Sequence, residues 1–338
     1  MMTVDSNSRK LLYKLAVSYY EDGLTQKQIG KRFGISRIKV SRLLRQARDQ
    51  KLVQIVVTPI DDVHSSLERA IESRYGIDEV VTVTPADHSR PDIGRALGPL
   101  VAESLMRSIQ GKEVIAITWG STLNAVVDSL PVANWPDLRI IQALGGLSSP
   151  DAEINGSDLV RRMAQSFGAR PLLLSSPGFV TNRAVRDALL LDTHISKMLS
   201  IAAKADIAVV GIGVLTPDSV VRQNNILNDA EIDRLKAKGV AGDIGMRFFD
   251  RQGESIDDEI NDRAIGLDLE QYKKIRRVIG VAGGVEKVEA IRAALRGHLI
   301  DVLITDEQTG IRLLEDNWPE PKNHLPEDFG KVVDLSTL

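Results

Sequence analysis

Apolar positions in the first fifty residues recur at helical spacing. Leu11, Leu15 and Tyr19 lie four residues apart, which places them on one face of a helix predicted over 8–21. Asp22-Gly23 ends that pattern. The sequence therefore begins with a short amphipathic helix that needs neighbours to cover its apolar face.

Two further helices are predicted around a glycine. Thr25, with Gln28 three residues later, has the capping-box pattern of a helix start, and Gly34 stands where a tight turn needs a left-handed residue. Ser36 is a candidate N-cap for a third helix that runs to about Asp49. Two short helices joined in this way are typical of a helix-turn-helix.

The third predicted helix has an apolar stripe on one side and basic residues on the other. Val40, Leu44 and Ala47 form the stripe, so the basic side chains face outward, where they can donate to guanine acceptors in the major groove. A solvated face on a helical bundle is the alternative, but the caps and the glycine turn favour a DNA reader. The candidate DNA-binding residues are Thr25, Gln26, Ser36, Arg37, Lys39, Ser41, Arg42 and Arg45.

A change of pattern follows the third helix. Residues 52–57 are rich in β-branched side chains and predict a wing strand, which Thr58-Pro59 breaks. We therefore predict a winged helix-turn-helix domain over 1–58, and an effector and oligomerisation domain over 59–338.

The second domain alternates between short apolar strands and amphipathic helices. This alternation predicts an α/β fold with a doubly wound, mostly parallel sheet. Strands are expected over 80–83, 114–118, 139–144, 171–174, 207–210, 277–281 and 302–305.

Glycine-bearing loops follow four of these expected strands. Ligands on such sheets bind beyond the carboxyl ends of the strands. Gly120-Ser121-Thr122 opens a helix, so its N–H groups and hydroxyls can cradle a phosphate. Each loop alone also fits a plain strand-to-helix turn, whereas together they favour a small-ligand site. The loops contain Gly120, Gly145-Gly146, Gly211 with Gly213, and Gly283-Gly284.

Two charged residues belong to the same set of loops. Asp243 can accept hydrogen bonds from sugar hydroxyls, and Lys287 can pair with a phosphate, although each also fits an exposed surface charge. Gly211-Ile212-Gly213 lacks the third glycine of a dinucleotide fingerprint, so no such cofactor is expected.

Charge is distributed unevenly. Residues 1–58 hold twelve Lys and Arg against four Asp and Glu, so this segment carries +8 and the remainder −11 of a net charge of −3. A basic module joined to an acidic body is typical of a nucleic-acid reader. The absence of cysteine excludes disulfides and thiolate metal sites, and no metal is expected. No long apolar run or signal stretch appears, so a cytoplasmic location is expected.

With these motifs in this order, the chain resembles the SorC family of bacterial sugar-responsive regulators. The matching segments are residues 20–29, 36–44, 119–122, 144–146, 209–213, 242–244 with 248–250, and 282–287. The resemblance implies an effector domain similar to sugar-phosphate isomerases and deaminases but without their catalysis. It also implies a phosphorylated sugar or polyol as effector, and a homotetramer. The ligand contacts that it implies are Gly120, Ser121, Thr122, Asp243, Lys287 and Asn155.

The expected function is regulation of a carbohydrate or polyol catabolic operon, with binding to double-stranded operator DNA controlled by that effector. One alternative is an isomerase- or deaminase-like enzyme with a DNA-binding arm, which needs an acid and base poised at the sugar. A purely architectural DNA binder would leave the glycine loops unexplained. We expect a homo-oligomer, dimer or tetramer, because one helix-turn-helix offers few contacts.

Overall fold

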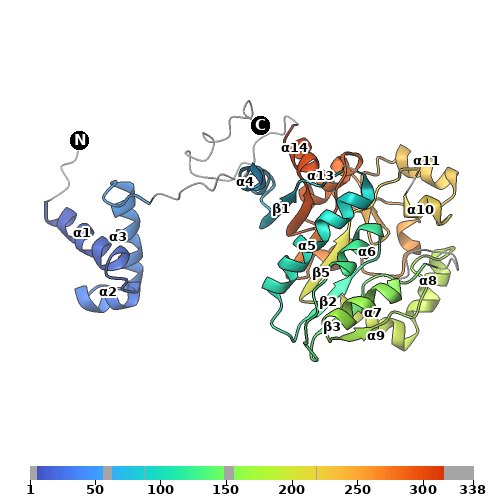
Figure 1. The fold of residues 1–338 in the computed structure, drawn as a ribbon, viewed down its shortest axis with the longest axis horizontal. Helices are drawn as coiled ribbons and strands as arrows, with labels where there is room; N and C mark the ends of the chain where they lie inside the picture. The colour runs from blue at the N-terminus through green and yellow to red at the C-terminus, as the bar shows by residue number, and fades with distance from the viewer. Residues whose placement is uncertain (1–5, 56–62, 88, 148–155, 218, 316–338) are drawn as a thin grey trace. The chain divides into compact units, whose positions relative to one another are not determined.

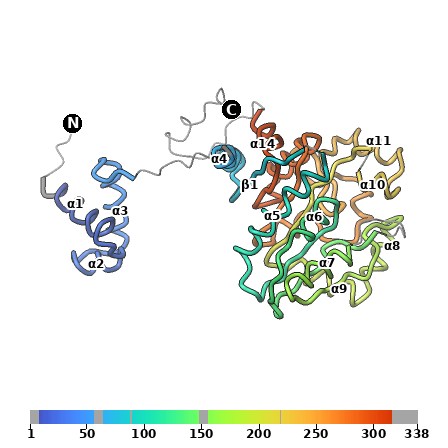
Figure 2. The backbone as a smooth tube through the Cα atoms, viewed as in Figure 1, coloured from blue at the N-terminus to red at the C-terminus, as the bar shows by residue number. Residues whose placement is uncertain are grey.

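The computed structural model describes residues 6–55, 63–87, 89–147, 156–217 and 219–315 (Figures 1 and 2). The chain divides into two compact units, residues 1–61 and 62–338. Among these residues no helix is both long and apolar enough to cross a membrane.

Three helices form the N-terminal unit, as predicted. They are α1 (Ser6–Tyr20), α2 (Gln26–Phe33) and α3 (Arg37–Asp49). Leu15, Ile29, Val40 and Leu44 are buried together where the three helices meet. Gly34 has φ +67°, the left-handed conformation that the turn between α2 and α3 requires.

The segment after α3 corrects the expected wing strand. Residues 51–53 form a turn and a bend, and residues 54–55 have no regular structure; residues 56 and 57 lie outside the described residues. Leu52 donates its N–H to the Ala47 carbonyl at 2.9 Å, and the Leu52 and Val53 side chains pack on Leu12 and Ala47. β-Branched residues favour a strand only where another strand pairs with it, and this unit has no strand in its described part.

A seven-stranded sheet organises the second unit. Its order is β1-β9-β8-β5-β2-β3-β4, and every pairing is parallel. The predicted mostly parallel α/β domain is therefore confirmed. The strands are β1 (Glu79–Val83), β2 (Val114–Ile117), β3 (Arg139–Gln142), β4 (Arg170–Leu172), β5 (Ile207–Gly211), β8 (Val278–Val281) and β9 (Val302–Asp306).

Helices cover both faces of this sheet (Figure 1). On one face Ile115, Ile117 and Val209 pack against α5, α6 and α7. On the other face Ala116 and Val210 pack with apolar residues of α4, α9, α13 and α14. The helices are α4 (Val63–Tyr75), α5 (Arg90–Ser108), α6 (Ser121–Asp128), α7 (Gly156–Ser166), α8 (Arg183–Leu190), α9 (Thr193–Ala202), α10 (Val220–Gln223), α11 (Asp229–Ala237), α12 (Leu269–Lys273), α13 (Val288–Arg296) and α14 (Glu307–Leu314).

The strand order reverses direction between β2 and β5. From β2 the chain builds outward through β3 and β4, then returns to β5 on the other side of β2 and builds through β8 and β9. Loops that leave neighbouring strands in opposite directions open a crevice at their carboxyl ends. The β2–β5 boundary is therefore where this topology places a ligand.

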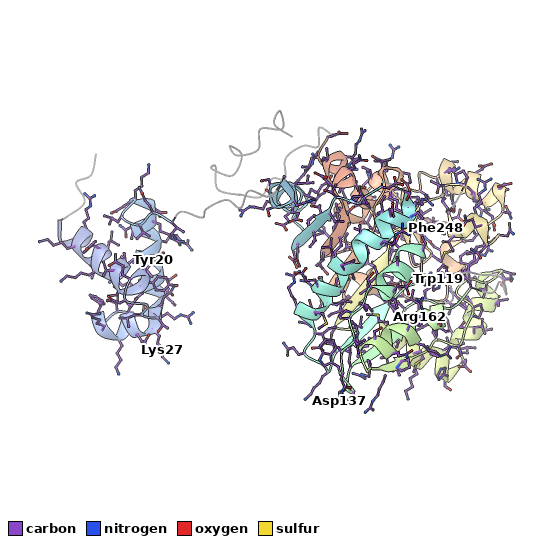
Figure 3. All side chains as sticks on the ribbon, viewed as in Figure 1. Tyr20, Lys27, Trp119, Asp137, Arg162 and Phe248 are labelled. Atoms are coloured by element: carbon purple, nitrogen blue, oxygen red, sulfur yellow. The ribbon has the colours of Figure 1, made fainter. Side chains whose placement is uncertain are left out.

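A small antiparallel hairpin, which the sequence did not predict, supplements the sheet. It consists of β6 (Gly242–Ile244) and β7 (Arg247–Phe249). Phe248 and Met246 are buried with Trp119 and Leu235 in a separate apolar cluster, and Figure 3 labels Trp119 and Phe248. This cluster holds the hairpin beside the loop that follows β2.

Candidate DNA-reading surface and effector site

The predicted DNA-reading residues gather on one surface of the N-terminal unit. A shallow hollow there is lined by six residues, five of them predicted contacts. Arg37, Lys39, Arg42 and Arg45 are exposed and make no ion pair with a described residue. The six lining residues are Gln26, Arg37, Ile38, Ser41, Arg42 and Arg45.

Two of the predicted contacts serve first as helix caps. The Thr25 hydroxyl accepts from the Gln28 N–H at 3.3 Å, and Gln28 Oε1 accepts from the Thr25 N–H at 2.9 Å. The Ser36 hydroxyl accepts from the Lys39 N–H at 3.2 Å. Both hydroxyl oxygens are thus engaged by the backbone, and they fix where α2 and α3 begin. The sequence missed Ile38, whose apolar side chain gave no DNA-binding signal.

In the second unit, the loop after β2 leads into an open helix start. Gly120 is the N-cap of α6, and as a glycine it offers no side chain to cap the first N–H groups of the helix. Among the residues that the structure describes, a Cβ placed on Gly120 would meet no atom within 4 Å. The hydroxyl of Thr118 accepts from the Gly211 N–H at 3.3 Å, which ties this loop to the end of β5. Ser121 and Thr122 form the first turn of α6, as predicted.

The loop after β5 is joined in turn to Asp243 on the hairpin. Gly213 donates to the Asp243 carbonyl at 2.8 Å, and Asp243 donates to the Gly213 carbonyl at 3.1 Å. A Cβ on Gly213 would lie 2.1 Å from Asp243 Oδ1, so only glycine permits this approach. The Asp243 carboxylate also accepts from the Met246 N–H at 3.1 Å.

Burial sets the acidity of Asp243. The residue is 8% exposed, and this desolvation raises its pKa to about 6, against the downward pull of the Met246 N–H and the Lys287 charge. Asp243 and Lys287 therefore lie near enough to interact electrostatically. Because Lys287 stands in the loop after β8, three strand-end loops converge here.

Two side chains that were not predicted from the sequence hold the segment that contains Lys287. Gly284 donates its N–H to Asp306 Oδ2 at 2.7 Å and to the Thr309 hydroxyl at 2.9 Å. Asp306 also caps α14 by accepting from the Thr309 N–H at 3.0 Å. The sequence does carry a signal for this cap, because Asp306 is an acidic residue three positions before Thr309 at the start of a helix.

The backbone of Gly145-Gly146 is hydrogen-bonded within the protein. The Gly145 and Gly146 N–H groups donate to the carbonyls of Ile265 and Ser176, both at 2.9 Å. The Gly145 carbonyl accepts from the Trp119 indole at 2.7 Å, and a Cβ on Gly145 would lie 2.3 Å from the Pro177 carbonyl oxygen. Gly145 allows close packing of backbone, whereas a Cβ on Gly146 would meet no described atom within 4 Å, and both N–H groups are engaged within the protein. Asn155 lies outside the described residues.

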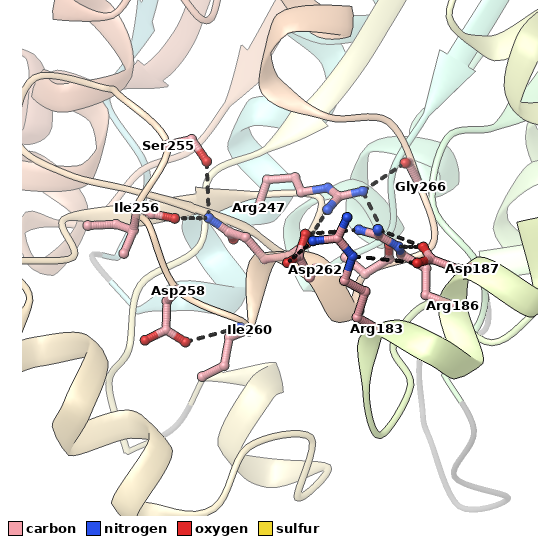
Figure 4. Close-up of polar contacts among 12 residues, drawn as sticks. Arg183, Arg186, Asp187, Arg247, Ser255, Ile256, Asp258, Ile260, Asp262 and Gly266 are labelled. Atoms are coloured by element: carbon pink, nitrogen blue, oxygen red, sulfur yellow. Dashed lines mark hydrogen bonds and ion pairs between the residues drawn. The ribbon is translucent and has the colours of Figure 1, made fainter.

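A partly buried arginine holds the loop that packs on Gly145. Arg247 donates to the Gly266 carbonyl at 3.1 Å (Figure 4). It also donates to the carbonyls of Leu267 at 3.1 Å and Ala264 at 3.2 Å. Arg186 reaches the same region through an ion pair with Asp262 at 3.2 Å. These contacts fix the backbone around the site without facing a ligand.

Comparison with known proteins supports both units. Residues 62–315 match the model of the family described as "Putative sugar-binding domain", and residues 15–50 match sigma-70 region 4. The deoxyribonucleoside regulator of Bacillus subtilis is 30% identical over 314 residues, which cover 93% of this chain and 100% of that protein. The erythritol catabolism regulatory protein of Brucella abortus is 28% identical, over 90% of this chain and 96% of that protein.

A solved structure extends the match across both units. The full-length sorbitol operon regulator SorC of Klebsiella pneumoniae has a TM-score of 0.70 at 28% identity, covering 92% of this chain and 100% of that one. The fold and these matches define a DNA-binding transcription regulator with a sugar-binding domain, and not an enzyme. The chain belongs to the SorC family, and the resemblance drawn from its motifs is confirmed.

The buried carboxyl gives a testable pH dependence. Because its folded pKa is raised, Asp243 favours folding below its unfolded pKa of 3.8, and this contribution is lost as pH rises through about 6. Asp243→Asn removes the cost of burying the charge. The variant's free energy of unfolding relative to the parent's should rise by about 2 kcal/mol between pH 4 and pH 7.

Urea unfolding at a series of pH values measures this difference. Asp137→Asn is the matched control, because Asp137 is 65% exposed and its pair with Arg170, at 3.8 Å, contributes little. A difference between Asp243→Asn and the parent that stays constant over this range would contradict the buried-charge assignment.

Proposed function

We propose that this chain controls a carbohydrate or polyol catabolic operon, and that a phosphorylated sugar or polyol governs its binding to operator DNA. The observation that carries the proposal is the uncapped start of α6 at the reversal of strand order, in the same chain as an exposed basic recognition helix. The names of the related regulators, which concern deoxyribonucleosides, sorbitol and erythritol, support this class of effector.

Charge favours a phosphate at the start of α6. The first N–H groups of a helix lack intrahelical partners and carry the positive end of its dipole, so they favour an anion. Gly120 leaves the space open, and the Thr122 hydroxyl and the Lys287 ammonium add donors for a phosphate. Asp243 accepts from sugar hydroxyls and repels phosphate, so it faces the sugar.

For operator binding, α3 enters the major groove with its N-terminal end at the base edges. Arg37 and Lys39 then read bases, while Arg42 and Arg45 hold phosphates. A single helix-turn-helix gives few contacts, so the chain binds as a dimer at least, and the family resemblance favours a tetramer. The second unit carries the oligomer contacts.

Effector and operator are coupled through the segment between the units. The first helix of the second unit, α4, is fastened to the sheet edge: Glu72 accepts from the Val80 N–H at 2.9 Å, and Glu68 accepts from the Thr82 N–H at 2.7 Å. When the effector changes the loops at the strand ends, this edge of the sheet shifts. The shift repositions the recognition helices within the oligomer. Effector and operator then alter each other's affinity reciprocally.

The DNA assignment predicts different losses for two arginines. Arg37→Ala should weaken operator binding by about 1–3 kcal/mol and relax specificity, because it removes a bidentate base contact. Arg45→Ala should instead make the plot of log affinity against log salt concentration less steep, by the amount expected for the loss of about one phosphate contact. Fluorescence anisotropy at several salt concentrations measures both effects.

The matched control is Arg32→Ala. Arg32 lies on α2 outside the hollow and pairs with Asp22 at 3.5 Å, so its loss should change specificity little. Unchanged affinity and selectivity in Arg37→Ala would defeat the assignment.

The effector assignment predicts that phosphate and sugar contacts separate. Thr122→Val and Lys287→Ala should each weaken a sugar phosphate by about tenfold to a hundredfold, the value of a hydrogen bond to a charged group, and weaken the free sugar little. Asp243→Ala should weaken both forms alike. Calorimetry with a sugar phosphate chosen by thermal-shift screening, and with its dephosphorylated form, measures the separation.

Two controls accompany these variants. Lys197→Ala removes an exposed lysine on α9 and should leave both affinities unchanged. Operator binding without effector should be the same in all variants. Equal losses for the two ligand forms in Lys287→Ala would show that Lys287 does not hold the phosphate.

A further inference from the structure

An apolar side chain lies among the basic residues of the recognition helix. Ile38 is the second residue of α3 and is 82% exposed. It lines the same hollow as Arg37, Ser41 and Arg42. Single exposed apolar residues are ordinary on a protein surface, but this one occupies the end of the helix that a helix-turn-helix presents to base edges.

Helical geometry keeps Ile38 out of the core. At about 100° per residue, Ile38 is roughly 200° around the helix from the buried Val40 and nearly in line with Arg42 and Arg45. It therefore shares the face that carries the cations. Its β-branched side chain has few rotamers and presents a defined apolar surface at little entropic cost.

The surrounding charge determines what can cover Ile38. Arg37, Arg42 and Arg45 make no ion pair with any residue that the structure describes. A second copy docked on this surface would bring two sets of these cations together, whereas a nucleic acid would neutralise them. The occupant that the charges favour is DNA.

The major groove offers one apolar feature to such a side chain, the C5-methyl group of thymine. We propose that Ile38 reads thymine by packing against this methyl group, next to the bases that Arg37 contacts. This inference depends on one part of the proposed function, the placement of α3 in the major groove. Ile38 would then supply an apolar element of specificity that the basic residues cannot provide.

Replacing thymine by deoxyuridine, which lacks the methyl group, tests the contact directly. The full chain selects its preferred duplexes from a random library, and the enriched duplexes are then made with thymine or with deoxyuridine. The parent should bind the thymine form about fourfold more tightly for each methyl group that Ile38 covers, which corresponds to about 0.8 kcal/mol. Ile38→Ala should bind both forms equally, and Ile38→Val should keep most of the preference.

Ile38→Ala should fold, since alanine has the higher helix propensity, and circular dichroism checks this. The matched control is Val132→Ala, which truncates a β-branched residue 92% exposed in the second unit and should keep the parent's preference. Equal binding of the two forms by the parent, or an unchanged preference in Ile38→Ala, would overturn the inference. A smaller oligomer in Ile38→Ala without DNA would also overturn it, because the residue would then be a protein contact. Failure to enrich any duplex would instead count against DNA reading itself.

Discussion

The reversal of strand order between β2 and β5 is the constraint on which the effector unit depends. Because the sheet grows in opposite directions from these two strands, the loops after them diverge, and α6 begins at this point with a glycine N-cap. The reciprocal hydrogen bonds between Gly213 and Asp243 then fasten the hairpin to the β5 side of this opening. An anion-favouring helix start and a carboxylate are thereby brought to one edge of the sheet, although more than a hundred residues separate them in the chain.

Elements with a local signal could be predicted from the sequence. The strands β2, β5 and β8 are continuous apolar runs, as buried parallel strands require, and α2 and α3 are specified by the caps at Thr25 and Ser36. The hairpin of β6 and β7 could not be predicted, because three-residue strands carry too little pattern and Phe248 is held by a distant cluster that includes Trp119. Residues 52–55 had the composition of a strand but no partner for one.

The candidate site was predictable only in part, for a related reason. A glycine that opens space for a ligand and a glycine that lets two backbones touch look alike in a sequence. A Cβ on Gly120 would meet no described atom within 4 Å, whereas a Cβ on Gly145 would collide with the Pro177 carbonyl. The Gly145 N–H also donates to a backbone carbonyl. Thr118, Asp306 and Thr309 hold the site through tertiary hydrogen bonds, and the local pattern that marks Asp306 as a helix cap does not reveal its bond to Gly284.

Reciprocity between the two ligands tests the central claim most directly. The dissociation constant of the selected duplex is measured with and without a saturating sugar phosphate, and that of the sugar phosphate with and without the duplex. Linked sites require that each ligand change the other's affinity by the same factor, typically about 5-fold to 150-fold. Equal factors of this size are the predicted result. A sugar phosphate that binds at Thr122 and Lys287 yet leaves operator affinity unchanged would contradict the account.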